Sequence, residues 1–406
     1  MGWLVGTSRA TKTILISADG FRWDYYGLIP TPGIDQIKAN GVQVKNLKNS
    51  FATVTFPNHY TLVTGLYEEN HGIVDNAMFD PVFNESFDMG TVSPKWWQAG
   101  EPVWVTAHRA GIESVCVNWV GCGVPVEGVL PTVWNPYNGS ISYEDRVGRI
   151  AENLQGPAQL GLLYFEEPDH SCHLFGPDSD QVLDAIRRVD NAILDLLSKV
   201  DIKEVNIVFT ADHGGVAVGN DKVVVLEDYS AKPFSLVISY GVAVAHLWPT
   251  HEDDTESILA DLSALPKHHA NCFPKQAVPT RLHYSANRRI APIVCIAELG
   301  WTIVQSKQDQ ERFHLKGSHG YDASKNEDSP MRPIFIAGGP DFRTQSIHEP
   351  PLPSFENVHI FALISTLLAI SPHLWPSING TTTAIHHLLR KSESDLLVDQ
   401  SVVLQW

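Results

Sequence analysis

Short runs of hydrophobic, largely β-branched residues recur along the chain, and each ends abruptly in polar residues. The runs are TILIS before Ala18, LGLLYF before Glu166, VNIVFT before Ala211, and PIFIAGG from Pro333. They do not alternate between apolar and polar positions, which is typical of strands buried on both faces of a parallel sheet. We therefore expect all four runs to be parallel strands of one central sheet.

Helical patterns lie between these strands. Residues 179–200, SDQVLDAIRRVDNAILDLLSKV, place apolar residues at helical spacing on one face and charged residues on the other. Strands that alternate with such helices predict an α/β fold, with a mostly parallel central sheet flanked by helices. In open sheets of this kind, ligands bind at the carboxyl ends of the strands.

Residues 222–316 have a different pattern. They contain LVISYGVAVAHLWP, RLHYSANRRIAPIVCIAE and WTIV, whose alternation favours antiparallel strands over βα units. We expect this region to be a small antiparallel subdomain inserted into a single domain that spans residues 1–406.

The balance of charges narrows the classes of partner. Of 406 residues 43% are hydrophobic, enough for a large core, and the formal net charge is −17. An acidic chain is poorly suited to bind a nucleic-acid polymer, although a small anion can bind where a local cation reverses the field. No run approaches the roughly 20 apolar residues that a membrane helix needs, and MGWLVGTSRATK is too short in its apolar core for a signal peptide.

Cysteines and glycosylation sequons bear on the compartment. The five cysteines form no CxxC pair and are odd in number, so no disulfide framework follows and at most two bridges can form. Three acceptor sequons, at Asn84, Asn138 and Asn379, permit a secreted glycoprotein.

Acidic and histidine residues gather after the expected strands. An Asp after a strand is often a turn former, and a single His is usually a surface or core residue, but joint placement at strand ends predicts a metal site. Nitrogen and oxygen donors without cysteine suit zinc better than magnesium, and six donors are too many for one open catalytic ion. The candidate ligands are Asp19, Asp169, His173, Asp212, His213 and His319.

The segment SFATVTFPNHY, residues 50–60, offers two candidate nucleophiles, Thr53 and Thr55. Its alternative interpretation is a polar turn that closes a strand, with Pro57 interrupting regular structure. Asn58 and His59 are interpreted as residues that form the turn and support the metal ligands.

Several motifs in this order resemble the ecto-nucleotide pyrophosphatase/phosphodiesterase family of the alkaline phosphatase superfamily. They are TFPNHYTLVTGLYEENHGIVDN, WWQAGEPVWVTAHRAG, PYNGSISYEDRV, YFEEPDHSCHLFGP, FTADHGG, GWTIVQ and GSHGYD. The resemblance covers nearly the whole chain and is strongest to short members with a single catalytic domain. It implies an alkaline-phosphatase-like fold and a zinc-dependent phosphodiesterase.

The resemblance also implies a role for each candidate. Thr55 would be the catalytic nucleophile and would touch one Zn²⁺ together with Asp19, Asp212 and His213. A second Zn²⁺ would be held by Asp169, His173 and His319. A zinc-bound hydroxyl becomes a usable nucleophile near neutral pH, so a covalent nucleotidyl-threonine would form and release a nucleoside 5′-monophosphate.

Substrate-binding residues follow in the same way. Asn76 would donate a hydrogen bond to a phosphate oxygen, and its alternative is a turn residue. Phe56 and Tyr137 would stack on the base, and Trp119 and Tyr164 match further pocket aromatics, with ordinary core residues as the alternative for the last two.

Three positions depart from the family pattern. Gly123 replaces an aspartate that reads the base edge in some members, and Val54 replaces a lysine before the nucleophile, which should weaken the binding of terminal phosphates. Cys172 stands between two candidate ligands where many members have glycine; we interpret it as an inert thiol, with sensitivity to oxidation as the alternative.

The resemblance predicts hydrolysis of nucleotide phosphodiester or pyrophosphate bonds, with NAD, dinucleoside polyphosphates or nucleoside triphosphates as substrates. The alternatives are a phospholipid or choline-phosphoester phosphodiesterase on the same frame, and a catalytically weak extracellular recognition module. An alkaline-phosphatase-type monoesterase is disfavoured, because the candidate nucleophile is a threonine. We expect an extracellular or cell-surface monomer whose signal and any membrane tether lie outside this sequence.

Overall fold

The computed structural model describes residues 11–238, 243–346 and 348–390. A seven-stranded sheet forms the centre, in the order β2-β17-β8-β1-β7-β5-β6. Its strands are β1 (Lys12–Ala18), β2 (Gly41–Gln43), β5 (Ser114–Val117), β6 (Val133–Asn135), β7 (Leu160–Phe165), β8 (Val205–Thr210) and β17 (Phe335–Gly338).

The fold class is as predicted, with one strand in a different direction. β1 pairs in parallel with both β7 and β8, and β5 pairs in parallel with β7 and β6. β17, the PIFIAGG run, pairs antiparallel with β8 and β2, so the prediction that it is a parallel strand is wrong. Its apolar residues reveal burial, and burial does not fix the direction of a strand.

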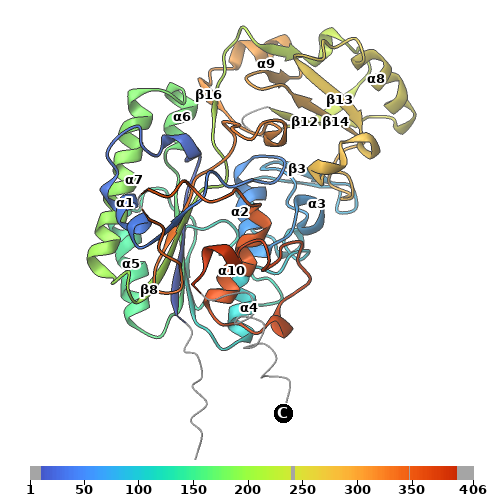
Figure 1. Ribbon diagram of the computed structural model, residues 1–406. Coiled ribbons are helices and arrows are strands. Elements are labelled where there is room, and N and C mark those ends of the chain that lie inside the picture. Colours follow the sequence, from blue (N-terminus) through green and yellow to red (C-terminus); the bar gives the residue numbers. More distant parts are fainter. Residues whose placement is uncertain (1–10, 239–242, 347, 391–406) are drawn as a thin grey trace, which may run out of the picture.

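Helices cover both faces of this sheet (Figure 1). One layer contains α1 (Pro32–Ala39), α5 (Tyr143–Gln155), α6 (Asp169–Phe175) and α7 (Asp180–Lys199), and the other contains α2 (Thr55–Thr64), α3 (Glu68–His71), α4 (Val103–Arg109) and α10 (Ile360–Leu367). Successive residues of a strand point to opposite faces, so Ile14 and Ile16 join one buried cluster and Leu15 joins the other.

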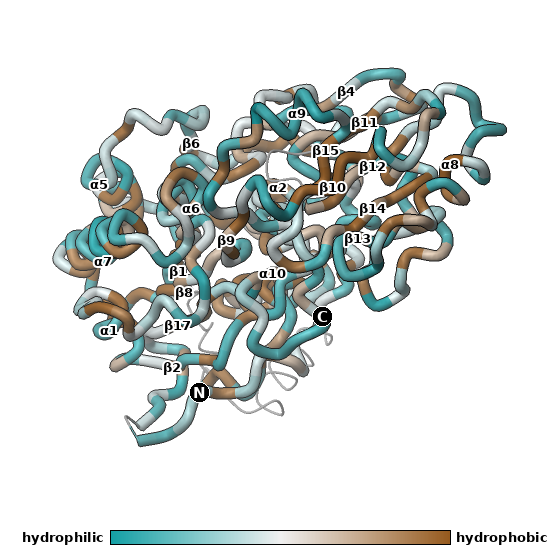
Figure 2. Tube along the Cα trace, turned by 90° about the horizontal axis from the view of Figure 1, so that it is seen from above, coloured by the Kyte–Doolittle hydropathy of each residue, from teal (hydrophilic) through white to brown (hydrophobic). Residues whose placement is uncertain are grey.

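The long helix α7 shows how the sequence pattern becomes structure. The Ser179 side chain caps its start by accepting a hydrogen bond from the backbone nitrogen of Val182. Its buried residues face the sheet, and Figure 2 shows hydrophilic residues along its outer side.

A second sheet lies beside the main one, at the upper right of Figure 1. It is antiparallel, in the order β11-β12-β14-β13, and falls within the region predicted to hold antiparallel strands. WTIV belongs instead to a separate parallel pair of β10 and β15, so its predicted antiparallel pairing is wrong. The strands and helices here are β10 (Val223–Val225), β11 (Phe234–Ile238), β12 (Val244–Pro249), α8 (Thr255–Leu262), β13 (Ala270–Pro274), β14 (Ile293–Ala297), β15 (Thr302–Val304) and α9 (Lys307–Arg312).

Two further short antiparallel pairs lie in the described part of the chain. β3 (Met78–Asp80) pairs with β4 (Glu85–Phe87), and β9 (Val216–Ala217) pairs with β16 (Gly317–Ser318), which brings the segment after β8 close to His319. Two disulfides join Cys116 to Cys122 and Cys272 to Cys295. Within the described ranges, every helix is too short or too polar to span a lipid bilayer.

Candidate metal centre and substrate cavity

Three aspartates meet at the carboxyl edge of the central strands. Asp19 follows β1, Asp212 comes two residues after β8, and α6 begins at Asp169 shortly after β7. Because β7 and β8 flank β1 in parallel, the three strand ends lie together. The backbone nitrogen of Asp169 donates to the carbonyl oxygen of Asp19 at 3.0 Å, which fixes the two segments to each other.

Three histidines complete the group. His173 lies one helical turn after Asp169, with its Nε2 3.1 Å from Oδ2 of that residue. His213 places Nε2 3.1 Å from Asp212 Oδ2 and 3.4 Å from Asp19 Oδ1. His319 Nε2 lies 3.8 Å from Asp169 Oδ1, and its ring stacks on that of His213 with centroids 3.6 Å apart. The structure therefore brings all six predicted ligands together.

Each of these histidines is oriented by a backbone carbonyl. Nδ1 of His173, His213 and His319 lies 2.9 to 3.0 Å from the carbonyl oxygens of Gly317, Gly214 and Thr53 respectively. A carbonyl oxygen only accepts hydrogen bonds, so each Nδ1 carries a proton and each Nε2 points toward the carboxylates. Metal-binding histidines are held in this way.

The carboxylates are prepared for a cation. Asp212 Oδ1 accepts hydrogen bonds from the backbone nitrogens of Gly20 and His213, at 3.1 and 2.9 Å, and Asp19 Oδ2 accepts one from the Tyr164 hydroxyl at 2.6 Å. The other oxygens, Asp212 Oδ2 and Asp19 Oδ1, are buried and accept no hydrogen bond from the described residues. Buried polar atoms are normally satisfied, so these two oxygens fit metal ligands.

The charges of the group support the same conclusion. Burial, Asp212 and Asp169 together raise the pKa of Asp19 well above its ordinary value. Burial opposes the ionised form of His173 as well, but Asp169 outweighs it and raises the pKa of His173 to about 9. Burial also opposes the ionised forms of Asp169 and Asp212, but the neighbouring histidines outweigh it and lower the pKa of both carboxyls. The crowded carboxylates therefore favour nearby positive charge, which a metal ion can supply.

His59 lies near Asp19 and Asp212 but supports the site from behind. Its Nδ1 is 2.8 Å from the carbonyl oxygen of Thr55, and its Nε2 is 2.8 Å from the Ser17 hydroxyl. Both ring nitrogens are therefore engaged. The His59 ring therefore holds the backbone of Thr55, one helical turn earlier. This contact agrees with the supporting role expected from the sequence.

Thr55 is the first residue of α2, and its Oγ1 lies 3.5 Å from Nε2 of His213. Pro57 sits in the first turn of this helix, where no backbone donor is needed, so its interpretation as an interruption is wrong. Thr53 differs from Thr55, because its hydroxyl donates to the Tyr321 carbonyl and accepts from the Gly320 nitrogen, each at 3.0 Å. Of the two threonines, only Thr55 lines the cavity described next.

A cavity of about 700 Å³ opens beside the Asp/His group. Asp19, Thr55, Asp169, His173 and His319 line one part of it, whereas Asp212 and His213 are fully buried behind. All five residues predicted to bind substrate also line the cavity: Phe56, Asn76, Trp119, Tyr137 and Tyr164.

The predicted substrate residues differ in their surroundings. Asn76 Oδ1 accepts a hydrogen bond from the backbone nitrogen of Phe56 at 2.7 Å, which leaves its amide nitrogen as a donor. Tyr137 is 61% exposed at the mouth, but Trp119 and Tyr164 are buried and pack edge-on against His59. Tyr164 therefore contacts both Asp19 and His59, and the sequence could not reveal these contacts.

Sequence reasoning missed one buried cation, Arg146. Its guanidinium donates to the carbonyl oxygens of Gly139 and Tyr164 and pairs with Glu166, with a shortest distance of 2.5 Å to that carboxylate. It thus connects the loop that carries Tyr137 to the end of β7. In the sequence, only the position of Arg146 within PYNGSISYEDRV could have indicated that it is buried, since a single arginine is usually a surface residue.

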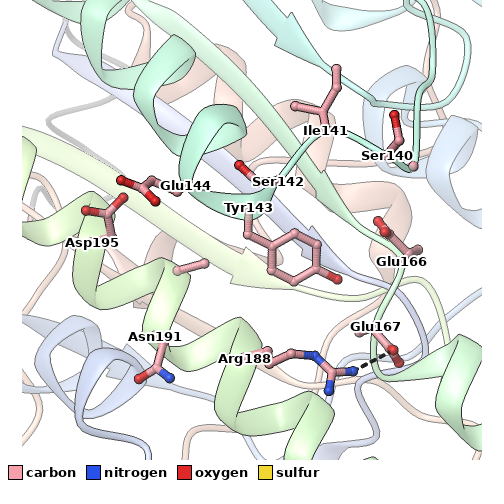
Figure 3. A pocket seen from close by; sticks show the side chains of 12 residues that line it. Ser140, Ile141, Ser142, Tyr143, Glu144, Glu166, Glu167, Arg188, Asn191 and Asp195 are labelled. Atoms are coloured by element: carbon pink, nitrogen blue, oxygen red, sulfur yellow. Dashed lines mark hydrogen bonds and ion pairs between the residues drawn. The ribbon is translucent and has the colours of Figure 1, made fainter.

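A second cavity, of about 670 Å³, lies between the start of α5 and α7 (Figure 3). Glu166 lines both cavities. In this second cavity Arg188 is paired with Glu167 at 2.8 Å, and the remaining charged side chains, including Glu144 and Asp195, are acidic. An anionic phosphate would therefore meet more acidic than basic side chains in this second cavity.

Cys172 is buried between the segments that hold the histidines, and burial raises the pKa of its thiol. Its Sγ lies close to the backbones of Gly215 and Gly317. A protonated, enclosed thiol agrees with the inert interpretation.

Comparisons with known proteins place the chain among relatives. The sequence model of the family described as type I phosphodiesterase / nucleotide pyrophosphatase matches residues 13–322. Human ectonucleotide pyrophosphatase/phosphodiesterase family member 5 is 38% identical over 405 residues, covering 96% of this chain and 82% of the relative. Human bis(5′-adenosyl)-triphosphatase ENPP4 is 34% identical, covering 92% and 81%. Mouse family member 1 is 35% identical, but the chain spans only 43% of its length.

Solved structures of similar proteins point to the same family. Murine ectonucleotide pyrophosphatase/phosphodiesterase 5 superposes with a TM-score of 0.86 at 38% identity, covering 93% of this chain and all of that chain. An inactive threonine-to-alanine variant of the same murine protein, in complex with AMP, also has a TM-score of 0.86, at 37% identity. The chain therefore belongs to the type I phosphodiesterase / nucleotide pyrophosphatase family, a family of hydrolases within the alkaline phosphatase superfamily.

Proposed function

We propose that this chain is a two-zinc phosphodiesterase that hydrolyses phosphodiester or pyrophosphate bonds in nucleotides through a covalent threonine intermediate. One observation carries the proposal: the Thr55 hydroxyl lies 3.5 Å from a histidine of the Asp/His group, at the wall of a cavity whose lining also includes several aromatic residues. A phosphate at Thr55 would thus lie next to space for a base.

The ligand sets are assigned as the sequence suggested. One zinc ion would be held by Asp19, Asp212, His213 and Thr55. The other would be held by Asp169, His173 and His319. When bound, zinc supplies a Lewis acid that lowers the pKa of a hydroxyl or water and neutralises charge on the phosphate. The three imidazole donors and the two unsatisfied carboxylate oxygens support this choice.

The chain's own residues then account for two displacements at phosphorus. Thr55 Oγ1 bonds to phosphorus while the bond to the leaving oxygen breaks, and the proton of the threonine hydroxyl passes through solvent to the leaving oxygen. Asn76, whose amide nitrogen is the available donor, stabilises a phosphate oxygen during both steps. Water then attacks phosphorus, the bond to Thr55 breaks, and the threonine oxygen recovers a proton as a nucleoside 5′-monophosphate leaves.

The substrates we propose are NAD, dinucleoside polyphosphates or nucleoside triphosphates. Two comparisons support this choice: one relative is named a bis(5′-adenosyl)-triphosphatase, and a murine relative was solved with AMP. Base stacking on Phe56 and Tyr137, which both line the cavity, is part of the proposal. We also propose that the enzyme is a monomer, that it is extracellular or bound to the cell surface, and that it carries glycans at its sequons.

The test compares Thr55→Ala with Thr53→Ser, a control two residues away that keeps its hydroxyl. With the p-nitrophenyl ester of thymidine 5′-monophosphate, Thr55→Ala should lower kcat by at least about 10³-fold, because a group that reacts as a unit with its neighbours is lost. Thr53→Ser should stay active, and both variants should retain zinc by mass spectrometry. Full activity of Thr55→Ala would contradict the proposal. Products from NAD, diadenosine triphosphate, ATP and glycerophosphocholine would separate the nucleotide from the choline-phosphoester alternative.

A further inference from the structure

The loop after β5 is tied to the edge of the central sheet. Cys122 in this loop is disulfide-bonded to Cys116 in β5. Cys116 in turn lies opposite Trp134 of β6 in the parallel register, so the bridge draws the loop toward Trp134. The pairing uses residues that the catalytic proposal does not need.

Two glycines on either side of Cys122 rest on two tryptophan rings. A Cβ atom at Gly123 would lie 3.1 Å from Cζ3 of Trp134, and one at Gly121 would lie 3.0 Å from Cζ3 of Trp97. Trp97 also packs against Phe56, with ring centroids 6.1 Å apart. Because these glycines have no side chains, indole rings cover this part of the loop.

The amide side chains at this end of the cavity bond to each other and to the backbone. Asn118 Oδ1 accepts from Asn135 Nδ2 at 3.0 Å and from the backbone nitrogen of Asn138 at 3.2 Å, and Asn118 Nδ2 donates to the Asn138 carbonyl at 3.0 Å. This network holds the loop that carries Tyr137. It also occupies the amide of Asn118, the polar side chain next to Trp119.

Much of the exposed lining of the cavity is apolar. Its exposed hydrophobic residues lie on three separate segments, and in the described part of the chain no lysine or arginine lines the cavity. The exposed hydrophobic residues that line the cavity are Met89, Val92, Trp134, Tyr137 and Leu174, each between 36% and 66% exposed. Ring and alkyl surface therefore makes up much of what a base meets here, beside polar side chains such as Thr91 and Asn135.

We propose that Trp134, seated on Gly123, forms the outer wall of the base subsite, and that ring and apolar contacts alone hold the base. The enzyme then accepts purine and pyrimidine nucleotides at similar rates. This inference rests on the proposed function. Stacking tolerates every base, because each has a π-face, whereas a polar group placed to read a base edge rejects the wrong base strongly.

The first test measures kcat/KM for the 5′-p-nitrophenyl esters of adenosine, guanosine, cytidine and uridine monophosphate. We expect the four values to agree within about tenfold, as stacking alone gives modest preferences. A difference above about 100-fold between any two bases would overturn the inference while leaving the phosphodiesterase proposal intact. Failure to cleave any of the four esters would instead overturn the proposed function.

The second test removes the wall. Trp134→Ala should lower kcat/KM for all four esters by about 5- to 150-fold, the range that loss of one stacking contact gives. It should leave methyl p-nitrophenyl phosphate, which has no base, unchanged, and Trp134→Phe should recover most of the loss. Val133→Ala, at the neighbouring exposed position that does not line the cavity, is the matched control. An equal loss with and without a base would show a merely structural role and contradict the inference.

Discussion

Glu68 offers a quantitative test of how the nucleophile's segment is supported. Its carboxyl is fully buried; Oε1 accepts hydrogen bonds from the Ser50 and Thr61 hydroxyls at 2.5 and 3.4 Å, and Oε2 accepts none from the described residues. Ser50 in turn donates its backbone nitrogen to Asn58, whose amide holds the carbonyl of Val54 beside Thr55. The carboxyl of Glu68 is therefore connected, through Ser50 and Asn58, to the backbone next to Thr55.

Burial raises the pKa of Glu68 from its ordinary 4.5 to about 8, and the nearby Glu69 adds to the effect. His71, which shares the Thr61 hydroxyl, does not offset it, because burial lowers the pKa of His71 to about 3 and keeps the ring neutral. The folded state thus binds the proton more tightly than the unfolded state. The resulting stabilisation is complete below about pH 4.5 and is lost as the pH rises to 8, by at most about 5 kcal/mol.

Glu68→Gln removes this titration but keeps an oxygen for Ser50. The free energy of unfolding, measured in urea with zinc at fixed concentration, should match the wild type near pH 4.5. It should exceed the wild type increasingly toward pH 9, by up to about 5 kcal/mol. Glu85→Gln, at an exposed carboxylate paired with Lys95, should show a small and constant difference. A Glu68→Gln difference that stays within about 1 kcal/mol at every pH would refute the reasoning.

Three further predictions concern the site and its frame. Tyr164→Phe removes the hydrogen bond to Asp19 and should weaken zinc binding by about 10- to 100-fold in a chelator competition; unchanged affinity would contradict the contact. Arg146→Met should destabilise the fold by about 3 kcal/mol in urea unfolding, since its partner Glu166 is partly exposed, and adding Glu166→Gln should recover part of the loss. Removing metal with a chelator should lower the melting temperature, because three buried carboxylates lose their cation, and zinc should restore it; a melting temperature insensitive to both additions would count against a metal centre.

Much of the fold followed from local patterns, and its exceptions have physical causes. The apolar runs identified β1, β7 and β8, because strands buried on both faces need hydrophobic residues throughout. The same pattern in β17 did not reveal the direction of the strand, which is antiparallel to both of its neighbours. WTIV was likewise a strand, but its partner, β10, lies about 80 residues earlier, and periodicity carries no information about such a partner.

The candidate site was predictable where it depended on strand ends. Asp19, Asp169 and Asp212 were predicted to follow parallel strands, and they meet because β7 and β8 flank β1, an order that the sequence did not predict. What could not be predicted were the contacts across the chain: the Tyr164 hydroxyl on Asp19, and the bridge from Cys116 to Cys122. These depend on tertiary packing, and cysteine spacing alone permits several pairings.

The most direct test of the proposed two-zinc threonine mechanism is anomalous diffraction at the zinc edge from crystals of the enzyme. The account predicts two peaks per chain, one in contact with Asp19, Asp212, His213 and Thr55 and the other in contact with the second set of three ligands. A single peak, another metal at both positions, or ions bound without Thr55 at either of them would contradict it.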